Sequence, residues 1–118
     1  MVSFSYKKNS RDEVPNCDVK IAIRKANKQR NEAVEVTFYN FSWKRIVGDG
    51  DYIVCGTLDG KMFFKKETKA NGYKLYKPTS SYEGVRCFKC VCDNLQAVKS
   101  HGYLEFDETE QLYFVRMK

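Results

Sequence analysis

Short stretches of alternating apolar and polar residues recur along this chain, and they predict β-strands. Residues 19–24 alternate Val, Ile and Ile with Lys, Ala and Arg, and residues 34–38 repeat the pattern with Val, Val and Phe. A period of two residues places successive side chains on opposite faces of a sheet. We therefore predict two half-buried strands joined by a long hairpin loop over residues 25–33.

The period changes at Asn40. Asparagine is a favoured helix N-cap because its side chain accepts a hydrogen bond from an exposed backbone amide, and Phe41, Trp43 and Ile46 suit a short helix packed on a sheet. The glycines of the segment 48–50 then end the helix. We predict one short helix that follows the second strand.

A tight hairpin is predicted at Asp59-Gly60. Apolar stretches at residues 52–57 and 61–66 flank this pair. An Asp-Gly pair favours the two-residue turn whose twist matches that of paired strands. The two stretches are therefore expected to be neighbouring antiparallel strands.

The same order of elements recurs in the second half of the chain. After Tyr73 come a strand at 85–92, a helix that Asp93 caps and that ends at 100–102, and a final hairpin with strands 103–106 and 112–117. A repeat of roughly fifty residues indicates a duplicated architecture. The predicted organisation comprises an N-terminal extension or edge strand (1–18), a first half (19–66), a linking turn (67–72) and a second half (73–118).

Composition favours a single β-rich domain over residues 1–118. A chain of this length buries enough surface for one core, and its 14% of aromatic residues favours strands. The predicted fold is mainly β (α+β): an antiparallel, barrel-like domain of about eight strands and two short helices, built from two pseudo-symmetric halves. No apolar run has the length of a membrane span, and no leader follows Met1, so we expect a cytoplasmic protein with no membrane partner.

Positive charge is concentrated in the first half. The net charge is +6, and residues 1–80 hold sixteen Lys or Arg against nine Asp or Glu, whereas residues 81–118 hold five against six. Such a surface attracts polyanions, although a solvated loop that keeps the protein soluble is the alternative interpretation. The densest basic segment carries no acidic residue and contains Lys20, Arg24, Lys25, Lys28 and Arg30.

The cysteines raise the question of a metal site. Cys87 and Cys90 have the spacing of a zinc knuckle, and His101 or Cys55 are possible further ligands. The segment alternates like a strand, however, so Cys90 and Cys92 share one face and Cys87 lies on the other. A second knuckle is missing. We therefore predict reduced, structural thiols, no metal and no other cofactor.

Catalysis is not expected. His101 is the one histidine, and it follows the predicted second helix, where histidine commonly caps the last carbonyls. We find no nucleophile in a sharp strand-to-helix turn and no carboxylate pair spaced to share one helical face. The chain is predicted not to be an enzyme.

Trp43 and Phe41 permit two interpretations. With Lys44 and Arg45 beside them, they match the combination of aromatic rings and cations that binds single-stranded nucleic acid. Trp43 lies three residues before Ile46 on one helical face, however, so it also suits a core anchor. The core interpretation is favoured for Trp43.

Residues 36–51, VTFYNFSWKRIVGDGD, resemble the swapped-hairpin domain of AbrB-like transcription regulators. In that family a strand runs into one helical turn, a Gly-Asp and a hairpin that ends in lysines, which Lys65 and Lys66 match. The resemblance implies a barrel of interleaved hairpins and DNA contacts from the first hairpin loop. The chain departs from the family in having Tyr39-Asn40 where a proline is usual and in having a longer first loop.

Two hypotheses about function follow. The first is a small non-catalytic regulatory protein that binds nucleic acid through the basic hairpin loop. The second is a small protein-binding inhibitor or adaptor, of the kind that phages and mobile elements use against host nuclease complexes; its partner would be an acidic or nucleic-acid-handling protein. Either is expected to be a monomer or a homodimer. The candidate binding residues are Arg24, Lys25, Lys28, Arg30, Lys44, Arg45, Lys65 and Lys66.

Overall fold

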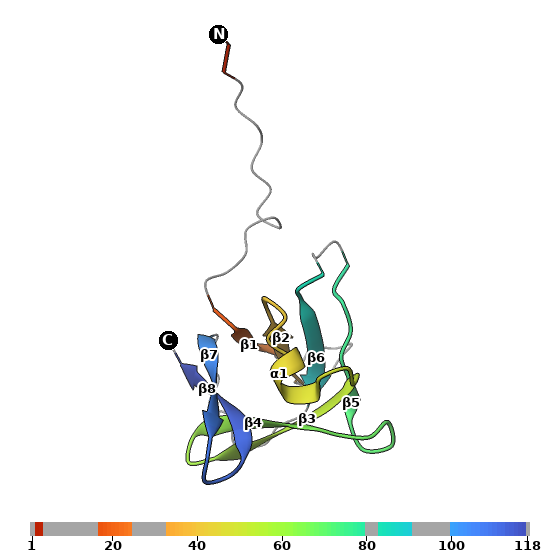
Figure 1. Ribbon diagram of the computed structural model, residues 1–118, viewed down its shortest axis with the longest axis vertical. Helices are drawn as coiled ribbons and strands as arrows, with labels where there is room; N and C mark the ends of the chain where they lie inside the picture. The colour runs from red at the N-terminus through yellow and green to blue at the C-terminus, as the bar shows by residue number, and fades with distance from the viewer. Residues whose placement is uncertain (1, 4–16, 25–32, 80–82, 91–99, 118) are drawn as a thin grey trace.

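The computed structural model describes residues 2–3, 17–24, 33–79, 83–90 and 100–117, and these residues form eight strands and one short helix (Figure 1). All eight strands belong to one antiparallel sheet. The elements are β1 (Val19–Arg24), β2 (Ala33–Phe38), α1 (Lys44–Val47), β3 (Tyr52–Leu58), β4 (Lys61–Lys66), β5 (Tyr73–Lys74), β6 (Arg86–Cys90), β7 (Ser100–Asp107) and β8 (Leu112–Met117).

The sheet curls into a nearly closed barrel. Its strands follow the order β5-β3-β4-β8-β7-β1-β2-β6. An antiparallel bridge between Tyr76 and Cys87 joins the two ends of this order, with both N–O distances at 3.0 Å or less. The prediction of a mainly β, barrel-like fold of about eight antiparallel strands is confirmed.

Hairpins from the two halves of the chain alternate around the barrel. The hairpin β1–β2 lies between β7 and β6, and the hairpin β3–β4 lies between β5 and β8. Each first-half hairpin therefore has second-half strands on both sides. Because its two hairpins are not neighbours, the first half does not form a continuous sheet without strands of the second half.

The core follows the predicted alternation. Along β2, Val34, Val36 and Phe38 are buried while the residues between them are half-buried. Phe38 packs against Phe64 and Phe88, with ring centroids 5.2 Å and 6.1 Å apart. Three aromatic side chains from β2, β4 and β6 thus meet inside the barrel.

The helix prediction was partly wrong. Asn40 does not cap α1, because its backbone is left-handed (φ 55°) and its side-chain amide donates to the carbonyl of Cys17. Trp43 occupies the cap position without a side-chain capping bond. Gly48 ends the helix, as expected, with φ at 58°. The described residues hold one helix rather than two, and the second, expected after Asp93, falls outside them.

The hairpin at Asp59-Gly60 is confirmed, with φ at 51° and 77°. The helix end expected at residues 100–102 is wrong, because these residues open β7. His101 pairs with Lys20 of β1 instead of capping a helix. Gly102 suits this strand because an added Cβ would lie 2.5 Å from Cγ1 of Val115.

Other predictions concern the chain ends and the linker. Residues 4–16 of the expected N-terminal extension lie outside the described residues, whereas Cys17 is buried beside the start of β1. In the expected linking turn, the amide of Gly72 donates to the carbonyl of Thr68 at 2.8 Å. Among the described residues, none belongs to a helix with the length and apolar character of a membrane span.

Candidate nucleic-acid interface

The segment between β2 and α1 holds two adjacent residues in a left-handed backbone conformation. Asn40 and Phe41 have φ angles of 55° and 60°. This conformation is uncommon for residues with a Cβ, and it costs about 1–2 kcal/mol per residue. Hydrogen bonds hold it in place: the amide of Phe41 donates to Gly84 at 3.0 Å, and the amide of Ser42 donates to Tyr39 at 3.0 Å. The direction of the Phe41 side chain is therefore set by the fold.

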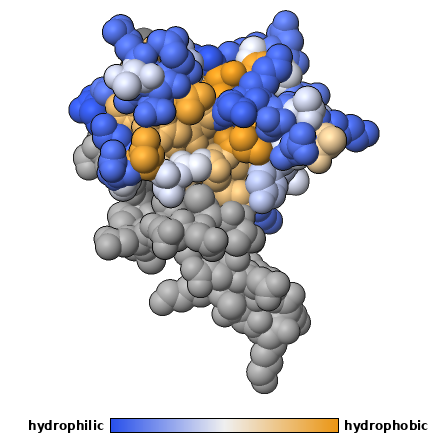
Figure 2. Space-filling view, turned by 90° about the horizontal axis from the view of Figure 1, so that it is seen from below, coloured by the Kyte–Doolittle hydropathy of each residue, from blue (hydrophilic) through white to orange (hydrophobic). Residues whose placement is uncertain are grey.

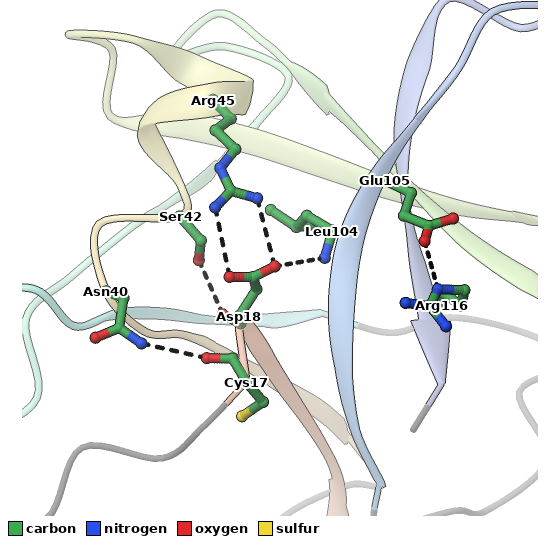
Figure 3. Close-up of polar contacts among 8 residues, drawn as sticks. All are labelled: Cys17, Asp18, Asn40, Ser42, Arg45, Leu104, Glu105 and Arg116. Carbon is green, nitrogen blue, oxygen red and sulfur yellow. Dashed lines mark hydrogen bonds and ion pairs between the residues drawn. The ribbon is translucent and has the colours of Figure 1, made fainter.

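Asp18 anchors the same segment to the barrel (Figure 3). Its backbone carbonyl accepts from the hydroxyl of Ser42 at 2.8 Å. Its carboxylate accepts from the guanidinium of Arg45 at 3.3 Å and from the amide of Leu104 at 2.9 Å. The side chain of Arg45 remains 47% exposed, so it combines this structural contact with access to solvent.

The two aromatic side chains of the predicted platform have different environments. Trp43 is 5% exposed and belongs to the core, as the favoured interpretation held, whereas Phe41 is 47% exposed. Their ring centroids lie 5.3 Å apart, so the core tryptophan supports the exposed phenylalanine from below. Phe41 thus contacts a core residue while 47% of its surface remains exposed to solvent.

Cations flank both rings. The ammonium of Lys44 lies 5.2 Å from the centroid of Phe41, and the guanidinium carbon of Arg86 lies 4.8 Å from the centroid of Trp43. Both distances are within the range of cation–π attraction. Arg86 was not among the candidate residues, and no sequence signal identified it, because it comes from β6, more than forty residues after Trp43.

Lys65 and Lys66 end β4 close to the helix. The side chain of Lys66 passes Gly50, where an added Cβ would lie 2.9 Å from its Cε. Gly50 in turn donates its amide to the carbonyl of Val47 at the end of α1. Lys65 lies on the other face of the strand, with its ammonium 3.6 Å from the carboxylate of Glu67. The structure therefore brings Lys66, but not Lys65, toward α1.

The basic hairpin loop is at the other end of β2. Arg24 ends β1 opposite Ala33, while Lys25, Lys28 and Arg30 lie outside the described residues. From Ala33 to Phe38 the strand extends roughly 17 Å at 3.3 Å per residue. Arg24 and the candidates in α1 therefore lie toward opposite ends of β2.

Acidic groups accompany some of these cations. A hydrogen bond from Lys77, together with its charge and that of Arg86, lowers the pKa of the Glu83 carboxyl. The pKa of Glu67 is lowered mainly by the backbone amide of Thr68, which donates to it at 2.9 Å, and also by Lys65. Lys65 and Lys77 are therefore partly neutralised, in contrast to Lys44, which lies over an aromatic ring.

The cysteines considered as metal ligands lie on both sides of β6. Cys90 is part of the core, whereas Cys87 is buried outside that cluster, and Cys92 lies outside the described residues. Within the part of the chain that the structure describes, no three metal-binding side chains come together. The neighbour of Cys90 is Cys55, whose sulfur lies 3.1 Å away.

A second surface feature lies between two hairpin turns. Figure 2, which views the molecule from below, shows apolar residues flanked by hydrophilic ones on the side where β3 and β4 lie in Figure 1. A hollow of about 240 Å³ is bordered by the β3–β4 and β7–β8 turns, and its lining contains more acidic than basic side chains. It is lined by Leu58, Asp59, Lys61, Phe63, Asp107, Thr109 and Glu110.

Comparisons of the chain with protein-family models, with curated proteins and with solved structures gave no significant match. Function is therefore inferred from the residues themselves.

Proposed function

We propose that this protein is a small non-catalytic regulatory protein that binds nucleic acid. The observation that carries the proposal is Phe41, which is 47% exposed on a hydrogen-bonded, left-handed backbone with the Lys44 ammonium 5.2 Å from its ring. An apolar ring kept in water by a strained backbone suits a binding role better than a packing role. Stacking of a base on such a ring contributes about 1–3 kcal/mol and tolerates any base.

The surrounding charges favour the same ligand. Lys44 and Arg45 belong to α1, which follows Phe41, and Lys66 lies beside the end of that helix, so their charges favour phosphate groups in this region. The basic hairpin loop begins at Arg24, roughly 17 Å from the helix region along β2. That separation equals about five nucleotide steps at the 3.4 Å rise of a stacked strand, and an extended single strand covers it in fewer, so a short oligonucleotide is long enough to reach both regions.

The test is fluorescence anisotropy with a labelled single-stranded oligonucleotide, and it uses two matched variants. Phe41 and Phe106 are both 47% exposed, and each contacts one other aromatic ring. Phe41→Ala is expected to raise Kd by about 5-fold to 150-fold, which corresponds to the loss of one stacked base. Phe106→Ala should leave Kd unchanged. Equal effects of the two substitutions would contradict the proposal.

The same assay tests the loop. Replacing Arg24, Lys25, Lys28 and Arg30 together by Ala should abolish binding at moderate salt, because each lost phosphate contact removes counterion release. For the unmodified protein, log Kd should rise linearly with log salt concentration. A Kd that does not change between low and moderate salt would exclude this function.

A protein-binding inhibitor is the second candidate, and the hollow between the hairpin turns favours it. Leu58, which is 46% exposed, adds apolar surface beside the polar residues of the hollow, and apolar surface next to polar residues is typical of protein interfaces. Because Asp59, Asp107 and Glu110 border the hollow, the partner that fits is a protein with a basic nucleic-acid-binding face, such as a nuclease. Replacing these three residues by Lys should then abolish inhibition of that nuclease, whereas Phe41→Ala should not.

We also propose that the chain is a fused and diverged tandem repeat of the swapped-hairpin type, similar to AbrB-like regulators. The strand order supports this proposal. If the labels of β1 to β4 are exchanged with those of β5 to β8, respectively, the set of neighbouring strand pairs around the barrel stays the same. Two of these pairs join equivalent strands of the two halves. In the pair β2–β6, Val36 lies opposite Phe88, and in the pair β4–β8, Phe63 lies opposite Phe114.

A further inference from the structure

Two thiols meet where the barrel closes. The Sγ atoms of Cys55 in β3 and Cys90 in β6 are 3.1 Å apart. These strands are not hydrogen-bonded to each other, because β5 comes between them in the order around the barrel. Yet β5 has only two residues and begins at Tyr73, opposite Ile53. Cys55 lies two residues beyond Ile53 in β3, past the point where β5 begins, and there its side chain directly contacts that of Cys90 in β6.

The two sulfur atoms differ in their exposure to solvent, which suits a thiol–disulfide exchange in two steps. Cys90 is 2% exposed within the core, whereas Cys55 is half-buried against it. A reagent from solvent therefore reaches Cys55 first. Disulfide formation then needs only a small approach of the sulfurs to about 2.05 Å, together with side-chain rotation.

We propose that Cys55 and Cys90 form an intramolecular disulfide on reaction with a small disulfide such as oxidised glutathione. The Cys55 thiol loses its proton, and the thiolate attacks one sulfur of the small disulfide, releasing one molecule of small thiol. The Cys90 thiolate then attacks Sγ of Cys55 and releases the second molecule. Two protein thiols are oxidised, one small disulfide is reduced to two thiols, and the protons of Cys55 and Cys90 end on those products.

The bond would act as a covalent latch on the barrel. It joins β3 to β6 on the side where the sheet is otherwise closed by the bridge from Tyr76 to Cys87. Because it links residues 35 positions apart, it restricts a long loop of the unfolded chain. The melting temperature is expected to rise on the order of 10 °C, from the chain-entropy effect in a domain of this size.

The chain provides matched controls. Cys87 and Cys17 are also buried thiols, at 2% and 3% exposure, but they lie outside the core cluster that holds Cys90 and that Cys55 packs against. Cys17→Ser and Cys87→Ser should therefore leave the disulfide intact. Cys55→Ser and Cys90→Ser should each prevent it, and Cys55→Ser is the milder change because Cys55 is only half-buried.

The experiment treats the folded full-length protein with oxidised glutathione, blocks remaining thiols under denaturing conditions and maps peptides by mass spectrometry. The expected result is a linked peptide pair containing Cys55 and Cys90, a mass lower by two hydrogen atoms and a higher melting temperature, all reversed by dithiothreitol. A stable glutathione adduct on Cys55 with Cys90 still reduced would overturn the proposal. So would a disulfide from Cys90 to Cys92, or five unreacted thiols.

Discussion

The guanidinium of Arg45 in α1 faces the carboxylate of Asp18, with Nη1 and Oδ2 3.3 Å apart, across 27 positions of sequence. The same carboxylate accepts the backbone amide of Leu104 in β7 at 2.9 Å, 86 positions away. One side chain therefore joins the start of β1, the helix and the opposite half of the chain. This arrangement supports the segment that carries Phe41.

Asp18→Ala is expected to lower the free energy of unfolding by about 1–3 kcal/mol, because the part-buried amide of Leu104 loses its acceptor. Urea denaturation measures the change. The control is Arg116→Ala, which removes an exposed ion pair with Glu105 and should cost less than about 1 kcal/mol. A larger loss for Arg116→Ala than for Asp18→Ala would show that this role of Asp18 is wrong.

Gly60→Ala is expected to destabilise the β3–β4 hairpin by about 1–2 kcal/mol, because Gly60 has φ at 77° and alanine is strained there. Gly56 provides the control, since an added Cβ meets nothing within 4 Å and its φ is not positive. Gly56→Ala should change stability by no more than about 0.5 kcal/mol. Chemical denaturation of both variants tests the pair, and equal losses would argue against the turn geometry.

The carboxyl of Glu83 should titrate at lower pH in the folded protein than in the unfolded chain. The hydrogen bond from Lys77 at 2.8 Å, and then the charges of Lys77 and Arg86, lower its pKa. Because the folded pKa is depressed, the stabilising contribution is present above the unfolded-state pKa. It is lost as pH falls through the folded pKa.

NMR titration of the side-chain carboxyl carbons measures this shift. Lys77→Met should raise the pKa of Glu83, while Glu67, whose pKa is lowered mainly by the amide of Thr68, should stay as it was. If Glu83 titrates at the same pH with and without Lys77, then the hydrogen bond is not the cause. Comparing the pKa values of the two glutamates thus shows whether Lys77→Met acts only on the neighbouring Glu83 or changes the electrostatic potential of the whole protein.

Several elements of the barrel could be predicted from local pattern. The alternation of Val34, Val36 and Phe38 predicted which face of β2 is buried, and Asp59-Gly60 predicted the hairpin that follows. Asn40 shows where this approach fails. Its side chain is a good helix cap in isolation, but contacts with Cys17 and Gly84 hold this segment in a left-handed conformation instead. Tertiary hydrogen bonds overrode a local preference of similar energy.

The candidate site divides in the same way. Sequence alone identified the basic residues, and it indicated that Trp43 belongs to the core. It did not indicate that Arg86 stacks on Trp43, that Phe41 remains exposed or that Cys55 meets Cys90.

By itself, then, the sequence determined most of the strands, the buried face of β2, the Asp59-Gly60 turn and the excess of positive charge. Only the tertiary structure decided the order of strands around the barrel, the exposure of Phe41 and the partners of Asp18. The physical reason is the separation in sequence of the residues involved, because a period of two residues and a tight turn depend only on neighbouring residues. By contrast, the pairing of β1 with β7 or of β2 with β6 depends on how all the apolar faces are buried together.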